Sequence, residues 1–99
     1  MKQDDLFKAL ADPNRRKIIW LLAKRDSMTA GEICEQFRIS KPAVSDHLKI
    51  LRNADLIYAD KQGQFIHYQL NTTVLQEIAT LLFDILKIKD EEHKDEEHA

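Results

Sequence analysis

The chain has 99 residues, 43% of them hydrophobic and 32% charged, with a formal net charge of −2, a length that fits one domain. No apolar run reaches the roughly 18 residues of a membrane helix, and no basic segment followed by an apolar stretch marks an export signal. One cysteine, Cys34, excludes an intrachain disulfide, and two glycines exclude a glycine-rich phosphate loop. We therefore expect a cytoplasmic protein.

Charge is unevenly distributed along the chain. Residues 90–99 hold six acids and one lysine, a net −5, so the whole-chain value of −2 leaves residues 1–89 at +3. A mildly basic body suits a small DNA-binding domain. The last ten residues are charged and lack hydrophobic periodicity, which predicts a disordered acidic tail at 90–99 after a domain at 1–89.

Two helices are predicted before residue 25. Leu6, Phe7 and Leu10 have the spacing of a short amphipathic helix. Asp12 is placed to cap a second helix, with Pro13 at its first position, that ends near residue 24. The inward face of the second helix is predicted to hold Ile18, Leu21 and Leu22, widened by Ile19 and Trp20.

Three cations, Arg15, Arg16 and Lys17, follow the start of the second helix. Because cations at a helix N-terminus oppose the helix dipole, we expect them to have another use. Ion pairs with Asp12 or with a neighbouring helix are one interpretation, and contact with phosphate is the other.

Residues 29–53, TAGEICEQFRISKPAVSDHLKILRN, are predicted to form two helices joined by a tight turn. Thr29 and Glu32 have the spacing of a capping box at the start of the first helix. Its inward residues are predicted to be Ile33, Cys34 and Phe37, and residues 38–39 make the turn.

The second helix of this pair is predicted to be capped by Ser40 or Lys41, with Pro42 in its first turn. Its N-terminal half carries small or hydrogen-bonding side chains, which let a backbone approach a groove, and a helix N-terminus favours phosphate. This layout predicts a helix-turn-helix whose second helix enters the major groove. A helical hairpin in an all-α core is the alternative. The apolar face comprises Val44, Leu48 and Leu51, widened by Ile50.

A β-hairpin is predicted after the helix pair. A strand at 57–61 is followed by a two-residue loop of Gln62 and Gly63, and residues 64–70 alternate with a period of two. A hairpin directly after a recognition helix is a wing, and Lys61, Gln62 and Gln64 at its tip carry donors for phosphate. A plain solvated hairpin is the alternative.

Asn71 is placed to cap a last helix that ends near Ile88. One narrow stripe of this helix is polar, formed by Gln76, Thr80, Asp84 and Lys87 and flanked by Glu77, and nearly all other positions are apolar. A chain of 99 residues has too little other protein to cover such a helix, so a second copy is the natural cover. A deeply buried core helix is the alternative. The predicted dimer interface lies in residues 3–11 and 72–88 and includes Leu6, Phe7, Leu10, Leu75, Ile78, Leu82, Ile85 and Leu86.

The elements in this order define a dimeric winged helix-turn-helix, mostly α with a β-hairpin wing (α-α-α-α-β-β-α). The segments ALADPNRRKIIWLL, TAGEICEQFRISKPAVSDHLKILRNADLI and GQFIHYQLN resemble the ArsR/SmtB repressor family, over about residues 5–88. The run KQGQFIHYQLNTTVLQ is most similar to its SdpR-like subgroup. The resemblance implies a homodimer that represses a nearby operon by binding an inverted-repeat operator in double-stranded DNA. It also implies relief through a membrane-bound sequestering partner.

Eleven residues are predicted to contact DNA. Asp46 departs from the family pattern, because a carboxylate near phosphates is repulsive. Either it accepts from a cytosine amine, or it is held away by Lys49 or another cation. His47 either donates to the DNA or packs beside Val44 and Leu51. The complete set is Ser40, Lys41, Pro42, Ala43, Ser45, Asp46 and His47 from the resemblance, with Lys49, Lys61, Gln62 and Gln64 from the helix and wing.

The metal sites of the family do not carry over to this chain. A thiol site needs at least two cysteines, whereas Cys34 stands alone, and Asp84 lacks the histidine two residues on that the other common site requires. His93 and His98 offer imidazoles without fixed geometry. We therefore expect no cofactor and no metal site.

The leading functional interpretation is a sequence-specific transcriptional repressor, acting also on its own promoter. The alternatives are a metal- or thiol-responsive sensor repressor of the same family and a winged-helix module that binds protein. Steep salt dependence of promoter binding separates DNA binding from protein binding. An enzyme is not expected, because the sequence offers no nucleophile–base pair, metal triad or phosphate loop.

Overall fold

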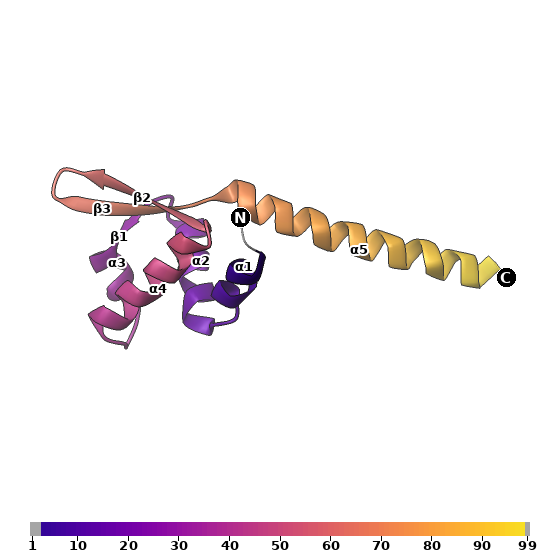
Figure 1. Cartoon of the computed structure of the whole chain (residues 1–99), viewed down its shortest axis with the longest axis horizontal. Coiled ribbons are helices and arrows are strands. Elements are labelled where there is room, and N and C mark those ends of the chain that lie inside the picture. The colour runs from indigo at the N-terminus through magenta and orange to yellow at the C-terminus, as the bar shows by residue number, and fades with distance from the viewer. Residues whose placement is uncertain (1–2, 99) are drawn as a thin grey trace.

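The computed structural model describes residues 3–98, with side chains for residues 4–92. Figure 1 shows a body of helices and a small sheet, from which the last helix projects. The elements are α1 (Gln3–Leu10), α2 (Pro13–Lys24), β1 (Met28–Thr29), α3 (Ala30–Cys34), α4 (Lys41–Asn53), β2 (Ile57–Gln62), β3 (Phe65–Leu70) and α5 (Thr72–His98). The sheet is antiparallel, in the order β1-β3-β2. The predicted winged helix-turn-helix is confirmed.

Side-chain caps fix the starts of α2, α3 and α4. Asp12 Oδ1 accepts from the backbone N–H groups of residues 14 and 15 at 2.8 and 3.2 Å. The capping box of α3 is complete: the Thr29 N–H donates to Glu32 Oε1 at 3.0 Å, and the Glu32 N–H donates to Thr29 Oγ1 at 3.2 Å. Ser40 Oγ accepts from the N–H of residue 43 at 3.2 Å. Each cap satisfies N–H groups that a helix start leaves without partners.

The turn between α3 and α4 begins earlier than the sequence predicts. α3 ends at Cys34. Two backbone hydrogen bonds between residues three apart follow, from Gln36 N–H to Ile33 O at 3.0 Å and from Phe37 N–H to Cys34 O at 3.1 Å. Phe37 therefore lies in the turn and not on the helix, although its side chain still packs against the core.

The hairpin differs from the prediction by one residue, and the sheet has an additional strand. Gln62 pairs with Phe65, so the loop consists of Gly63 and Gln64. Gly63 has a φ of +62° at the first loop position, where glycine suits the mirror-image turns of tight hairpins. β1 pairs with β3, with Met28 opposite Tyr68. A strand of two residues is too short to show any periodicity in the sequence.

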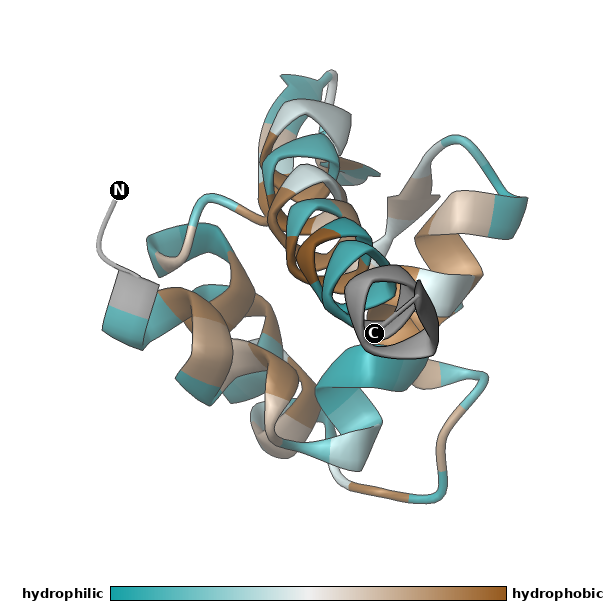
Figure 2. Ribbon diagram, turned by 90° about the vertical axis from the view of Figure 1, so that its right-hand side faces the viewer, coloured by the Kyte–Doolittle hydropathy of each residue, from teal (hydrophilic) through white to brown (hydrophobic). Residues whose placement is uncertain are grey.

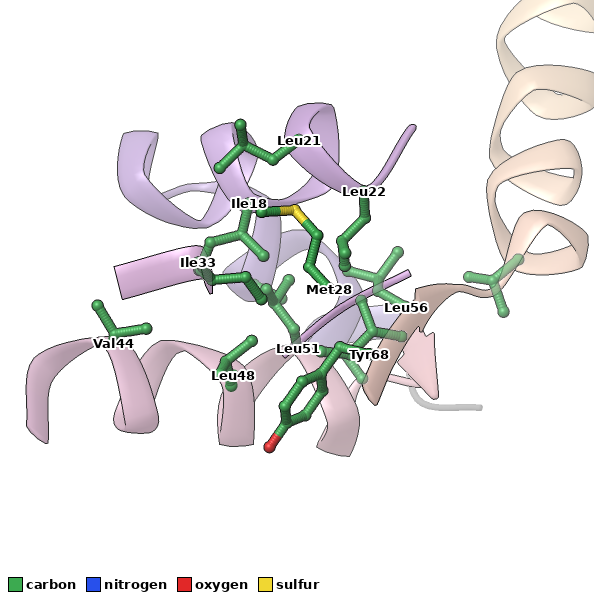
Figure 3. Packing of buried hydrophobic residues seen from close by; sticks show 14 of the residues in the cluster. Ile18, Leu21, Leu22, Met28, Ile33, Val44, Leu48, Leu51, Leu56 and Tyr68 are labelled. Atoms are coloured by element: carbon green, nitrogen blue, oxygen red, sulfur yellow. The ribbon is translucent and has the colours of Figure 1, made fainter. Parts of the chain in front are cut away.

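The core joins α2 to α4 across β1, α3 and the base of the hairpin (Figure 3). The predicted inward faces of both helices are confirmed, but two residues expected to widen them are not inside. Trp20 is 57% exposed, with the Lys24 ammonium 3.7 Å from its ring centroid, and Ile50 is 39% exposed. The main buried side chains are Ile18, Leu21, Leu22, Met28, Ile33, Val44, Leu48, Leu51, Leu56 and Tyr68.

The segment that follows α4 is hydrogen-bonded to the residue that follows β3. Asp55 has a φ of 59°, its N–H donates to Arg52 O and the Leu56 N–H donates to Leu51 O, both at 3.0 Å, which is a Schellman ending. Asn71 Nδ2 donates to Asp55 O at 2.8 Å, and its buried Oδ1 has no hydrogen-bond partner. Asn71 therefore fastens two chain segments together and does not cap α5 with its side chain.

α5 is longer than predicted and projects from the body. It continues to His98, whereas we expected a helix ending near Ile88 and a disordered tail at 90–99. Residues 89–98, KDEEHKDEEH, contain no proline or glycine and are rich in helix-favouring glutamate and lysine, and Lys89 Nζ lies 3.2 Å from Glu92 Oε2. No helix among residues 3–98 combines the length and apolar character needed to cross a membrane.

The projection leaves apolar side chains of α5 uncovered. The radius of gyration is 17.3 Å, against about 13 Å for a compact chain of this length. Val74 is buried against the body and Leu75 and Ile78 are half-buried, but the later apolar residues are exposed, and Figure 2 shows apolar positions along the helix. These exposed residues are Leu81, Leu82, Phe83, Ile85, Leu86 and Ile88.

Candidate nucleic-acid interface

α4 is held by one face, and the opposite face is free. Val44, Leu48 and Leu51 fix the helix in the core, with at most 2% of each residue exposed. The predicted DNA-contacting residues of this helix lie on the surface or at its edge. Ser40, Lys41, Pro42, Ser45, Asp46 and Lys49 are exposed, and Ala43 and His47 are half-buried.

The N-terminus of α4 has the properties of an anion-facing end. Ser40 Oγ accepts a hydrogen bond from the N–H of Ala43, and Pro42 has no N–H. The exposed Lys41 adds a cation beside the positive end of the helix dipole. Small side chains at Ala43 and Ser45 leave the backbone of this turn accessible. This end of the helix therefore offers positive potential with little steric obstruction.

Asp46 is not restrained by a cation. Neither Lys49 nor another cation of residues 4–92 lies within 4.0 Å of its carboxylate. Of the two roles expected for Asp46, acceptance of a hydrogen bond from a cytosine amine thus needs no ion pair to be broken first.

The wing presents its predicted donors unequally. Lys61, Gln62 and Gln64 are all exposed around the hairpin tip. However, the Gln62 Nε2 donates to Asp60 Oδ2 at 3.1 Å, a contact that the sequence did not suggest. Lys61 is therefore the charged donor of the wing tip, and the amide of Gln62 is partly engaged by a neighbouring acid.

Arg15 and Arg16 bind the C-terminus of α1. Arg15 Nε donates to Ala9 O at 2.8 Å and its Nη2 donates to Lys8 O at 2.9 Å, while Arg16 Nη1 donates to Leu10 O at 2.8 Å. The last carbonyls of a helix carry partial negative charge and lack partners within the helix. The two arginines thus secure α1 to α2 by donating to backbone carbonyls. This role differs from both interpretations drawn from the sequence, ion pairing and phosphate contact.

Lys17 has a comparable structural role. Its Nζ donates to Gln36 O at 2.6 Å and lies 4.5 Å from the centroid of the Phe37 ring. The lysine therefore links α2 to the turn of the helix-turn-helix through a carbonyl and an aromatic face.

Arg15 also reaches the recognition helix. Its Nη1 lies 3.4 Å from Nδ1 of His47, a half-buried residue on α4. The sequence placed His47 either at DNA or beside Val44 and Leu51, but gave no indication of a guanidinium partner 32 residues away. Only the packing of α2 against α4 brings these two side chains together.

Two carboxyl groups in caps are perturbed. Burial raises the pKa of Asp12, but hydrogen bonds from the backbone N–H groups of residues 15 and 14, the charge of His47 when its ring is protonated, and the charge of Arg15 outweigh burial and lower the pKa below its ordinary value. Hydrogen bonds from Thr29 lower the pKa of Glu32. Cap hydrogen bonds contribute to both shifts, so these two carboxylates have a structural role at the starts of α2 and α3.

The predicted dimer residues occupy three different environments. Leu6 is 3% exposed and packs inside the core, whereas Phe7 is 53% exposed and Leu10 is half-buried. On α5, residues 75 and 78 are half-buried against the body. Leu82, Ile85 and Leu86 are 49–59% exposed. Leu6 therefore supports α1 from within, and the surface available to a partner lies on Phe7 and on the distal half of α5.

The described residues contain no group of three or more His, Cys, Asp or Glu side chains placed to hold a metal ion. Cys34 is half-buried and packs against the core. The side chains of His93 and His98 lie outside the described part of the structure.

Comparison with known proteins places the chain in a family. A family model described as bacterial regulatory protein, arsR family, matches residues 12–59. The transcriptional repressor SdpR of Bacillus subtilis (strain 168) is 49% identical over 87 residues, which cover 88% of this chain and 96% of that protein. The chain belongs to the arsR family of bacterial regulatory proteins. It is a regulator of transcription and not an enzyme.

Solved structures agree with this assignment. An ArsR-like transcriptional regulator from Rhodococcus sp. RHA1 has a TM-score of 0.80 and 26% identity, covering 88% of this chain and 79% of that one. A possible transcriptional regulator for arsenical resistance has a TM-score of 0.72 and 30% identity, covering 82% of this chain and 83% of that one. The fold of residues 3–98 is therefore that of known regulators over most of its length.

Proposed function

We propose that this protein is a homodimeric transcriptional repressor that binds an inverted-repeat operator, including one in its own promoter. The observation that carries the proposal is the presentation of α4. Its apolar face is buried, its small and polar N-terminal half is exposed, and a wing with Lys61 at its tip follows it directly. The predicted contacts are with base edges from Ser45, Asp46 and His47, and with phosphates from Lys41, Lys49 and the wing.

The proposed dimer uses Phe7 and the exposed apolar residues of α5. Six large apolar side chains beyond residue 80 are 46–70% exposed, which is a larger apolar surface than a monomer of this size usually carries. A second copy related by a two-fold axis covers this surface with an equivalent one. Two linked recognition helices then fit half-sites about one helical turn, ~34 Å, apart.

Operator binding is tested by fluorescence anisotropy with the protein's own promoter fragment and with a scrambled fragment, over a range of salt concentrations. We expect tighter binding to the promoter and a log–log salt slope that reflects several phosphate contacts. Lys61→Ala should lower that slope by about one unit on both fragments, because a phosphate contact carries no sequence information. Lys87→Ala, on the polar stripe of α5, is the matched control and should leave the slope unchanged.

The result also decides between classes of function. Equal, weak and salt-insensitive binding to both fragments would contradict the proposed repressor function and favour a module that binds protein. The proposal places the protein in the cytoplasm with its DNA. A membrane-bound sequestering partner stays a prediction of the family resemblance, because no surface of the described residues singles one out.

A further inference from the structure

One guanidinium connects the recognition helix to the N-terminal helices. Arg15, on α2, donates from Nε and Nη2 to the last turn of α1, at 2.8 Å to Ala9 O and 2.9 Å to Lys8 O. Its remaining arm points to α4, where Nη1 lies 3.4 Å from Nδ1 of His47. The planar fork of arginine can serve these separate directions at once, which the single ammonium of a lysine cannot do.

The chemistry of Arg15 bears on which neutral tautomer is present in the ring that it faces. A guanidinium has only N–H donors and stays charged, so a ring nitrogen that is hydrogen-bonded to it is the acceptor. In the neutral imidazole of His47, Nδ1 then carries the lone pair and Nε2 carries the hydrogen. Asp12 is an acid near this ring, and its Oδ1 already accepts two backbone N–H groups at the start of α2.

We propose that Arg15 is a positioning residue for operator recognition, which holds His47 in its Nε2–H form so that this N–H is the donor presented to DNA. The inference rests on the proposed DNA-binding function. A fixed N–H donor suits the acceptors of the major groove, namely N7 and O6 of guanine, N7 of adenine and O4 of thymine, and does not suit the amine of cytosine. Because Arg15 also bonds the end of α1, it sets the position of α4 relative to a helix of the proposed dimer.

The first test measures the free protein without DNA. Nitrogen-15 NMR correlations of the histidine rings, assigned with His47→Gln, distinguish the two neutral tautomers. We expect the Nε2–H form of His47 to dominate in the wild type and a mixture to appear in Arg15→Met, which keeps the apolar stem but has no donor. Arg16→Met is the matched control, since Arg16 bonds Leu10 O and makes no hydrogen bond to His47, and it should leave the tautomer unchanged. A wild-type ring mainly in the Nδ1–H form would overturn the proposal, even if Arg15→Met failed to fold.

The second test measures affinity for the protein's own promoter fragment in a double-mutant cycle. The amide nitrogen of glutamine reaches about as far as Nε2 of histidine, and that of asparagine only as far as Nδ1. His47→Gln should therefore bind more tightly than His47→Asn. Arg15→Met should weaken binding about tenfold in the wild-type background and less than about threefold in the His47→Asn background.

The two tests separate the possible failures. Equal losses from Arg15→Met in both backgrounds would show that Arg15 acts independently of His47, and the proposal would be wrong. If no variant distinguishes promoter from scrambled DNA, the proposed repressor function fails while the tautomer measurement still stands. An unchanged tautomer in a folded Arg15→Met protein would overturn the positioning role regardless of DNA binding.

Discussion

Leu82 provides the most direct test of the proposed dimer, because it lies on α5 beyond the part that the body covers. It is 55% exposed in the single chain. Burying a whole leucine side chain contributes about 1.5–3 kcal/mol, so the half that is still exposed should contribute roughly 1 kcal/mol when a partner covers it. Two-fold symmetry places two copies in the interface. Leu82→Ala should therefore weaken dimerisation by about 2 kcal/mol, or roughly 30-fold in Kd.

Leu82→Glu should have a larger effect, because it also buries a carboxylate without a partner. Sedimentation velocity over a range of micromolar concentrations measures the monomer–dimer equilibrium, and anisotropy with promoter DNA measures the consequence. We expect the monomer to dominate and operator affinity to fall with it, since one recognition helix cannot span two half-sites. Gln76→Glu, which adds the same charge to the exposed polar stripe of α5, should remain dimeric.

Two results would refute this reasoning. A Leu82→Glu protein that sediments as the same dimer as the wild type would show that the distal half of α5 is not the contact. A monomeric variant with full operator affinity would show that DNA binding does not need two linked helices. Dissociation of Gln76→Glu as well would assign the effect to charge and not to position on the helix.

Three further predictions concern the DNA surface, the cap of α2 and the absence of a switch. Ser45→Glu should weaken operator binding by at least tenfold with an unchanged thermal midpoint; retained affinity would place the recognition surface elsewhere. Asp12→Ala should cost about 1 kcal/mol in urea unfolding at pH 7, and Asp12→Asn much less. Because the pKa of Asp12 is lowered in the folded protein, its contribution is complete above the unfolded pKa of about 4 and is lost as the pH falls through the lower, folded value. Zinc, chelator or mild oxidant should change operator affinity by less than about threefold, and a larger loss that disappears in Cys34→Ser or on deletion of residues 90–99 would reveal a sensor site.

Local chemistry made several elements predictable from the sequence. Asp12, Thr29 and Ser40 each carry an oxygen that can bond nearby N–H groups, so the starts of α2 and α3 could be placed to the residue, and the cap of α4 to Ser40 or Lys41. The buried faces of α2 and α4 followed from apolar spacing, because a helix repeats every 3.6 residues wherever it packs. The exposed, small-residue half of α4 was predictable for the same reason.

Tertiary structure decided the features that depend on distant residues. β1 exists because β3 lies beside it, and Trp20 is exposed because no element of residues 3–98 covers that side of α2. The partners of Arg15 lie on two other helices, and no local pattern in the sequence brings His47 near it. The sequence therefore determined most of the segments that form helices and strands and which faces of α2 and α4 are buried, since those depend on neighbours along the chain. Packing decided which polar side chains of different elements meet, because such contacts form between residues far apart in sequence and depend on how whole elements are arranged.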